Sequence, residues 1–207
     1  MKAHLFYSLL GYLSGSVLYA VLIPRLLLGV DVTDQSEDHN PGTFNVFDQC
    51  GIPVGIAVLA CELLKAFLPV YIASKRVDVG NLWFSLVLAA PVIGHVFPIF
   101  FHFQGGKGIA AAFGSLIGLH SFSLPLLLLA GVYVFFSVFV RVDTHLWRSV
   151  ATFATFGLLM LRYCPIASIR CGALLICAVV VVKHLQKYSG DAFAVSVPLL
   201  RRWKHAR

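Results

Sequence analysis

The chain has 207 residues, of which 59% are hydrophobic and only 12% are charged, and its mean hydropathy is +0.86. Soluble domains carry about 25% charged residues, so this composition excludes a soluble globular domain and indicates a polytopic membrane protein. The net charge of +7 then reflects membrane topology and attraction to anionic lipid, and nucleic acid is not an expected partner.

Seven apolar runs follow one another along the chain. Five are long, at residues 5–28, 54–72, 82–101, 122–140 and 171–182, and two are shorter, at residues 109–119 and 150–160. A membrane-crossing helix needs about 20 apolar residues, so the two shorter runs must be tilted, tucked into the bundle or re-entrant. We predict one all-α transmembrane domain, residues 1–207, with about seven spans, and five or six as the alternative.

The first run is also too long for a signal-peptide core of about 7–15 residues, so we expect it to be the first span.

Cytoplasmic ends of spans hold an excess of Lys and Arg, and this excess predicts the orientation of the protein in the membrane. With the N-terminus outside, the basic residues expected inside are Arg25, Lys107, Arg141, Arg148, Lys183, Lys187, Arg201, Arg202, Lys204 and Arg207. Those expected outside are Lys2, Lys75, Arg76, Arg162 and Arg170. This excess predicts a cytoplasmic C-terminus, with the basic tail of residues 201–207 as an interfacial anchor.

The cysteines offer no framework for a disulfide-linked or metal-binding fold. They are odd in number, form no CxxC pair and lie mostly in or beside apolar segments: Cys50, Cys61, Cys164, Cys171 and Cys177. Such residues are usually free, buried thiols. We therefore expect neither a disulfide nor a zinc site, and no cofactor.

Four polar segments fall on the predicted cytoplasmic face, at residues 29–51, 101–108, 141–149 and 184–191. Ionisable groups near hydrocarbon are costly, so their convergence at one membrane face is where a functional site is expected.

The third long run is followed by a glycine-rich loop, at residues 103–108, that has the character of a phosphate-binding loop. Its glycines, Gly105, Gly106 and Gly108, let backbone N–H groups converge on an anion, and Lys107 adds a positive charge. A helix opening directly afterwards would turn its positive end toward the same spot. The alternative is a simple connector between spans with a lysine that reaches toward the headgroups.

The first polar segment contains a strong turn signal, Asn40-Pro41-Gly42, followed by Thr43 and Asn45. The amide and hydroxyl groups of these residues are suitable donors to a charged headgroup. The alternative is an acidic, solvated loop, because the segment holds five of the nine acidic residues of the chain.

The acidic residues of this segment raise a second hypothesis, a divalent cation held by carboxylates. The candidate ligands are Asp31, Asp34, Glu37, Asp38 and His39. Their spacing matches no known cation-binding loop, so no metal is predicted.

Taken together, these segments resemble the bacterial integral-membrane acyl-phosphate:glycerol-3-phosphate acyltransferases of the PlsY type. That family has a Gly-His-x-Phe-Pro…Lys-Gly-Gly-Lys-Gly central motif, and this chain has Gly94-His95-Val96-Phe97-Pro98 followed by Gln104-Gly105-Gly106-Lys107-Gly108. The order of the other elements and the chain length agree as well: part of an N-terminal loop, Glu62-Leu63-Leu64-Lys65 for Asp-x-x-Lys, and a histidine, His184, before the C-terminus.

The departures from the family pattern fall on residues expected to meet charge. Residues 37–39 stand where the family has Gly-Ser-Gly, and Asp48 stands where an arginine is usual. Gln104 replaces a lysine, and Lys187 occupies the position of an asparagine. We interpret Lys187, one helical turn beyond His184, as a replacement for the positive charge lost at Asp48.

The resemblance implies transfer of a fatty acyl group from acyl-phosphate to the 1-hydroxyl of glycerol 3-phosphate, which forms lysophosphatidic acid. The catalytic residues it implies are His184 and Lys107, and His95 is expected to be structural first. The phosphate-binding residues, from the loops and the resemblance together, are Asn40, Gly42, Thr43, Asn45, Gly105, Gly106, Lys107, Gly108 and Lys187.

The expected partners are therefore acyl-phosphate, glycerol 3-phosphate and the lipid bilayer, and the expected setting is a bacterial inner membrane, with the protein as a monomer. One alternative is a divergent paralogue that uses another acyl acceptor or has lost catalysis, which residues 37–39 and Asp48 favour. A second alternative, a small anion transporter, predicts charged or helix-breaking residues near mid-span, and apart from Glu62 and Lys65 the runs offer few.

Overall fold

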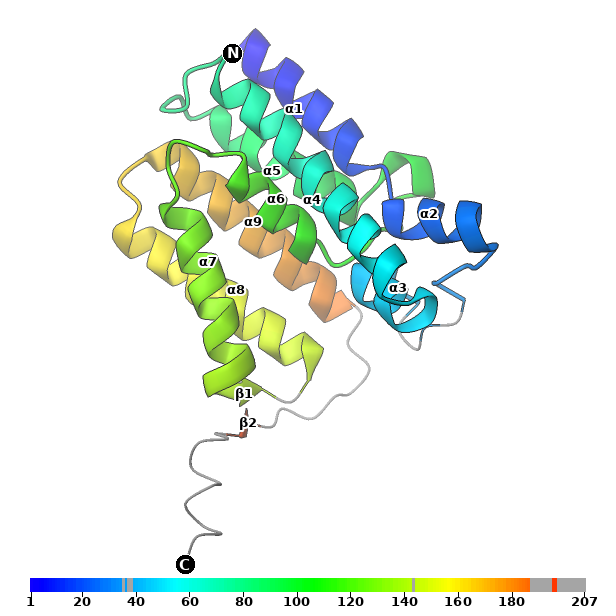
Figure 1. Ribbon diagram of the computed structural model, residues 1–207. Coiled ribbons are helices and arrows are strands. Elements are labelled where there is room, and N and C mark those ends of the chain that lie inside the picture. The colour runs from blue at the N-terminus through cyan, green and yellow to red at the C-terminus, as the bar shows by residue number, and fades with distance from the viewer. Residues whose placement is uncertain (35, 37–38, 143, 187–194, 197–207) are drawn as a thin grey trace, which may run out of the picture.

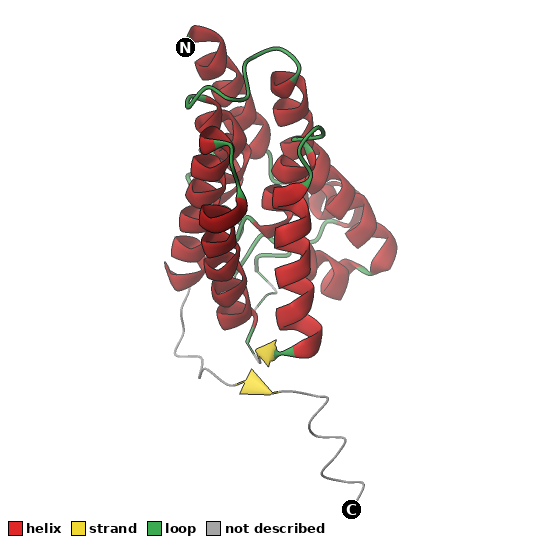
Figure 2. Ribbon diagram, turned by 90° about the vertical axis from the view of Figure 1, so that its left-hand side faces the viewer, coloured by secondary structure: helices red, strands yellow, loops and turns green. Residues whose placement is uncertain are grey.

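The computed structural model describes residues 1–34, 36, 39–142, 144–186 and 195–196, which form a bundle of helices (Figure 1). The described chain is almost wholly helical, as Figure 2 shows, apart from a two-residue antiparallel pairing of β1 (Arg141–Val142) with β2 (Val195–Ser196). Lys187 and the basic tail of residues 201–207 lie outside the described residues.

The helices follow the predicted apolar runs, with longer or shorter ends. In chain order they are α1 (Lys2–Gly15), α2 (Tyr19–Leu28), α3 (Thr43–Cys50), α4 (Ile52–Ser74), α5 (Phe84–Val96), α6 (Ile109–Ile117), α7 (Leu124–Val134), α8 (His145–Tyr163) and α9 (Ala167–Gln186). A 3₁₀ turn, η1 (Ile99–Phe101), follows α5, and a π-helical turn, η2 (Phe135–Phe139), extends α7. Within the described residues, four helical segments are long and apolar enough to cross a membrane: Lys2–Leu28, Ile52–Ser74, Phe84–Phe101 and Ala167–Gln186.

The structure adds detail to two of these runs, and Lys2–Leu28 remains long and apolar enough to serve as the expected first span. The first run is a broken helix, because the chain leaves α1 at Gly15 and begins α2 at Tyr19 (Figure 1). The run at residues 150–160 belongs to a helix of 19 residues, α8, whose polar first turn is capped by Thr144, which accepts a hydrogen bond from the Trp147 N–H at 3.3 Å. Helix α3 was not predicted, since its sequence reads as the end of a polar loop.

Helix α5 lies at the centre of the bundle and is buried along almost its whole length, packed against α1, α4, α6 and α9. Glycines bring its neighbours into backbone contact. A Cβ atom on Gly15 of α1 would lie 2.1 Å from the Pro91 carbonyl oxygen, and one on Gly94 of α5 would lie 2.1 Å from the Tyr12 carbonyl oxygen. This close approach of small residues is the usual way in which helices associate where no water drives them together.

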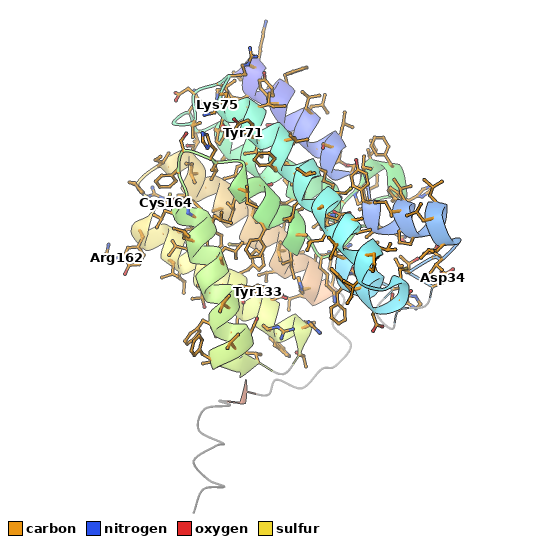
Figure 3. All side chains as sticks on the ribbon, viewed as in Figure 1. Asp34, Tyr71, Lys75, Tyr133, Arg162 and Cys164 are labelled. Carbon is orange, nitrogen blue, oxygen red and sulfur yellow. The ribbon has the colours of Figure 1, made fainter. Side chains whose placement is uncertain are left out.

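The outer surface is apolar on many helices, as the side chains in Figure 3 illustrate. Leu26, Ile52, Leu127 and Leu158 are all more than half exposed. Soluble proteins rarely expose this much apolar surface to water, whereas such a surface suits contact with lipid chains. All five cysteines are free thiols, of which Cys164 and Cys177 are buried and the other three are only partly buried.

The contact between α4 and α6 provides a test of this packing. A Cβ atom on Gly114 would lie 2.4 Å from the Leu63 carbonyl oxygen, whereas one on Gly131 of α7 would meet nothing within 4 Å. We expect Gly114→Ala to destabilise the purified protein by about 1–3 kcal/mol, the cost of overpacking a close contact. Gly131→Ala is the matched control and should leave the thermal midpoint unchanged or raise it, because alanine is the better helix former. Equal midpoints for the two variants would contradict the packing.

Candidate active site

The predicted polar segments surround one large, open cavity of about 2060 Å³. Its lining comes from the loop between α2 and α3, from the loop between α5 and α6, and from the ends of α8 and α9. Predicted site residues in the lining are Asn40, Gly42, Thr43, Asn45, Gly105, Lys107, Gly108 and His184. Sequence segments far apart along the chain are therefore brought to one place, as the polar pattern predicted.

The glycine loop folds back onto the end of α5. The Gly105 N–H donates to the Val96 carbonyl at 3.2 Å, and the Gly106 N–H donates to the His95 carbonyl at 3.2 Å. A Cβ atom on Gly105 would lie 1.9 Å from the His95 carbonyl oxygen, so only glycine allows this contact. The expectation that these two amides face an anion is therefore corrected: their N–H groups are already donated, and they hold the loop in place.

The loop residues that line the cavity include Lys107 and Gly108, together with Gln104 and Gly105. Gly108 has a φ of +83°, a value that favours glycine, and it is the N-cap residue of α6. Lys107, half-buried, precedes it, and Ile109 and Ala110 of the first turn of α6 also line the cavity. The positive end of this helix and the lysine therefore act on the same space.

His184 is 1% exposed and lines the cavity from the last turn of α9. Its Nδ1 atom lies 2.8 Å from the Val180 carbonyl oxygen. A carbonyl accepts only from a protonated nitrogen, so the neutral ring carries its proton on Nδ1 and its lone pair on Nε2. The imidazole is thereby held as a base whose accepting nitrogen is Nε2.

The turn at residues 40–45 is fixed by its own hydrogen bonds. The Gly42 N–H donates to the Asn40 carbonyl at 2.7 Å, and the side-chain amide of Asn45 donates to the same carbonyl at 2.8 Å. Asn40 is buried, and Thr43 begins α3 directly after the turn. Part of the predicted donor capacity of this loop thus shapes the loop itself.

A buried polar cluster borders the cavity and is formed by Glu62, Lys65 and His95, all 5% exposed or less, of which His95 lines the cavity. The Lys65 Nζ atom is 2.6 Å from the Glu62 Oε2 atom, and His95 Nδ1 is 3.0 Å from both. The Gly106 position abuts the other edge of the ring, because a Cβ atom there would lie 2.4 Å from His95 Nε2. The cluster thus connects α4 and α5 to the glycine loop, and Gly106 contacts it without lining the cavity.

The same cluster accounts for the break between α1 and α2. Lys65 Nζ donates to the Val17 carbonyl at 2.5 Å, and the Ala20 N–H donates to Glu62 Oε1 at 3.3 Å. Backbone groups released where the helix is interrupted are therefore paired with side chains of α4. Glu62 and Lys65 were predicted only as charges near mid-span, and their i, i+3 spacing inside an apolar run was the signal that they form a buried ion pair at the site.

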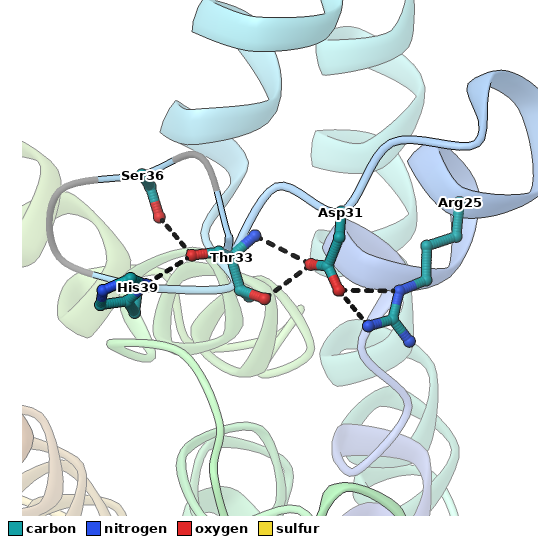
Figure 4. A network of polar contacts seen from close by, with 5 residues as sticks. All are labelled: Arg25, Asp31, Thr33, Ser36 and His39. Atoms are coloured by element: carbon teal, nitrogen blue, oxygen red, sulfur yellow. Dashed lines mark hydrogen bonds and ion pairs between the residues drawn. The ribbon is translucent and has the colours of Figure 1, made fainter.

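The acidic loop is organised around Asp31, which pairs with Arg25 and accepts hydrogen bonds from the backbone N–H and hydroxyl of Thr33 at 3.0 and 2.6 Å (Figure 4). Nδ1 of His39 lies 2.8 Å from the Thr33 carbonyl. Within the described part of the chain, no three His, Cys, Asp or Glu side chains are grouped to hold a metal ion, and Glu37 and Asp38 lie outside that part.

The buried cluster predicts a specific pattern of stability. Glu62→Gln leaves the Lys65 ammonium buried without its counter-ion, which should cost about 3–5 kcal/mol in the free energy of unfolding. The double variant Glu62→Leu/Lys65→Met removes both charges and should recover much of this loss. Thermal unfolding of the purified proteins measures both effects. A Glu62→Gln protein as stable as the wild type would refute this account of the cluster.

The loop predicts a pH dependence. Partial burial alone raises the pKa of Asp31, but the hydrogen bonds from Arg25 and Thr33 outweigh it and hold the pKa at about 2, below the usual 3.8. A lowered pKa stabilises the folded state above the usual value, and this contribution disappears as the pH falls toward 2. The difference in thermal midpoint between wild type and Asp31→Asn should therefore shrink over that range. A difference that stays constant over that range would contradict this account of Asp31.

Two features define the class of protein. The helices are apolar enough to cross a membrane, and a polar cavity lined by lysines, histidines and a glycine loop lies at the end of the bundle. Within that class the chain belongs to the glycerol-3-phosphate acyltransferase family, whose model matches residues 5–190. The resemblance to PlsY-type proteins is thereby confirmed.

Individual relatives agree with the family. A glycerol-3-phosphate acyltransferase of Klebsiella pneumoniae subsp. pneumoniae is 42% identical over 108 residues, 52% of each chain. That of Pasteurella multocida is 41% identical over 112 residues, 54% of this chain and 55% of its own. The chain thus spans about half the length of the curated relatives it matches.

A solved structure extends the likeness to the whole fold. The crystal structure of PlsY (YgiH), an integral membrane glycerol 3-phosphate acyltransferase, in its glycerol 3-phosphate form, has a TM-score of 0.73 and 25% sequence identity. The match covers 99% of this chain and 93% of that one. The lysophosphatidic acid form of the same protein gives the same TM-score at 23% identity and supports the fold alone.

Proposed function

We propose that this protein transfers a fatty acyl group from acyl-phosphate to the 1-hydroxyl of glycerol 3-phosphate and forms lysophosphatidic acid and inorganic phosphate. The observation that carries the proposal is the single cavity lined by Lys107, His184 and the turn at residues 40–45. Family membership and the names of the relatives support the same reaction.

The proposed chemistry needs no acyl-enzyme intermediate. The acceptor hydroxyl oxygen attacks the acyl carbonyl carbon, the bond between that carbon and the phosphate oxygen breaks, and inorganic phosphate leaves with the electron pair. Nε2 of His184 takes the hydroxyl proton, which the tautomer fixed by Val180 permits. Lys107 offsets the repulsion between two phosphate-bearing substrates and holds them close together.

The apolar part of the cavity suits a fatty acyl chain. Leu59 and Leu63 of α4, Phe113 and Ile117 of α6, and Tyr133 of α7 line it. A chain bound along these side chains would place its phosphorylated end toward Lys107, at the polar part of the same cavity. The acyl chain of the proposed donor would therefore contact apolar side chains, and its phosphate would lie near a positive charge.

We also propose the number of spans, the orientation, the location and the oligomeric state of the protein. The chain is a single transmembrane domain of about seven spans, with four long helices supplemented by shorter or less apolar ones. The excess of basic residues supports an external N-terminus and a cytoplasmic C-terminus. The bacterial relatives support a bacterial inner membrane, and we propose that the protein acts there as a monomer.

A second candidate function is acyl transfer to a different acceptor. The observation that favours it is Asp48, an exposed carboxylate that lines the cavity. A negative charge here opposes a phosphate and would favour an acceptor with a neutral or positive group nearby.

The test is an assay of detergent-purified protein with palmitoyl-phosphate and glycerol 3-phosphate. Release of inorganic phosphate should require both substrates and should be matched by lysophosphatidic acid. We expect His184→Gln to lower kcat by about 10²–10⁴-fold, as for loss of a general base, and Lys107→Ala to abolish acceptor-dependent release. Lys75→Ala, an exposed lysine outside the cavity, is the control and should keep full activity. Phosphate release that ignores the acceptor would mean hydrolysis and would refute acyl transfer.

A further inference from the structure

Lys183 is a second lysine in the cavity lining. It was predicted above only as one of the basic residues on the cytoplasmic side of the membrane. It lies in the last turn of α9 and lines the cavity beside His184. Its residue surface is 7% exposed, while Val182 and Leu185 on either side of the pair are 46% exposed. Val180, Lys183 and His184 therefore form the inward face of the helix, at the i, i+3 and i+4 spacing. A lysine reaching for the headgroups would lie on the outward face instead.

The ammonium group of Lys183 has no carboxylate partner among the described residues. Its Nζ atom lies 5.5 Å from the centre of the Phe97 ring, a weaker interaction than an ion pair. Glu62, the buried carboxylate among the described residues, is already paired with Lys65 and His95. The positive charge of Lys183 is therefore left to the cavity.

Comparison with Lys65 shows what a structural lysine looks like in this protein. Lys65 is 4% exposed, and it is matched by the Glu62 carboxylate at 2.6 Å and the Val17 carbonyl at 2.5 Å. Burial of a charge is costly unless it is paired, so a lysine that is 7% exposed and lacks such partners reduces the stability of the empty protein. The negative end of α9 compensates only in part, because its charges are fractional.

We propose that Lys183 binds a substrate phosphate in the cavity, as a second cationic anchor beside Lys107. This inference rests on the proposed function, which brings two phosphate groups into one cavity, and it assigns one lysine to each. Asp48 stands where the family has an arginine, so a positive charge is missing there. Lys183, one position before His184, would replace that charge, a role that the sequence analysis gave to Lys187.

The test compares Lys183→Met with Lys75→Met. Lys75 also lies over an aromatic ring, that of Tyr71 at 5.7 Å, but it is exposed and belongs to the opposite end of the bundle (Figure 3). Thermal unfolding is measured without ligand and with glycerol 3-phosphate or inorganic phosphate. We expect Lys183→Met to unfold at the same or a higher temperature than the wild type without ligand, and to lose part of the stabilisation by phosphate, because Lys107 still lines the cavity. Lys75→Met should behave as the wild type in every condition.

Steady-state kinetics distinguish the two sources of the phosphate. Loss of a charged hydrogen bond should raise one KM by about 10- to 100-fold. A rise for glycerol 3-phosphate assigns Lys183 to the acceptor, and a rise for palmitoyl-phosphate assigns it to the donor. Lys183→Arg, which keeps the charge, should retain binding and provides the test if Lys183→Met does not fold.

Two results would overturn the proposal: stabilisation by phosphate that is unchanged in Lys183→Met, or kinetics in that variant equal to those of the wild type. Lys183→Arg that folds and yet binds no phosphate would also count against it. Phosphate binding by the wild type without any acyl transfer would refute the proposed enzyme while leaving the anionic site intact. The two proposals can therefore fail separately.

Discussion

The arrangement of the site depends on the buried cluster of Glu62, Lys65 and His95. One carboxylate neutralises a lysine and contacts a histidine, and together these side chains pair with backbone groups exposed by the break between α1 and α2. The outer edge of His95 meets Gly106, so the cluster also sets the position of the loop that carries Lys107. A polar interior in an apolar bundle is costly, and here it joins three separate parts of the chain.

Much of the fold and part of the site followed from the sequence. Apolar runs located the helices, and the glycine loop with His184 located the residues that line the cavity. Periodicity alone does not reveal the break at residues 16–18, because the apolar run continues through it and the cause lies on α4. The amides of Gly105 and Gly106 were misassigned for a related reason: a glycine pattern predicts backbone freedom but does not say which acceptor the N–H groups find.

The two buried lysines of the site show why residue type and burial together are insufficient to assign a role. Lys65 and Lys183 both lie on inward helix faces, and only the partners distinguish them. Lys65 is paired within the fold, whereas Lys183 presents its charge to the cavity. The difference separates a charge that maintains the scaffold from one available to a ligand. The i, i+3 spacing of Glu62 and Lys65 indicates the first in the sequence, whereas no comparable spacing marks the second.

The hydrogen bonds that fasten the glycine loop to α5 have a kinetic consequence. Gly105 and Gly106 fix the backbone immediately before Lys107 against the most deeply packed helix of the bundle. The proposed binding of phosphate by Lys107 would then require movement of its side chain rather than the slower opening and closing of a flap. The backbone that carries this lysine would accordingly keep the same place before and after a ligand enters the cavity.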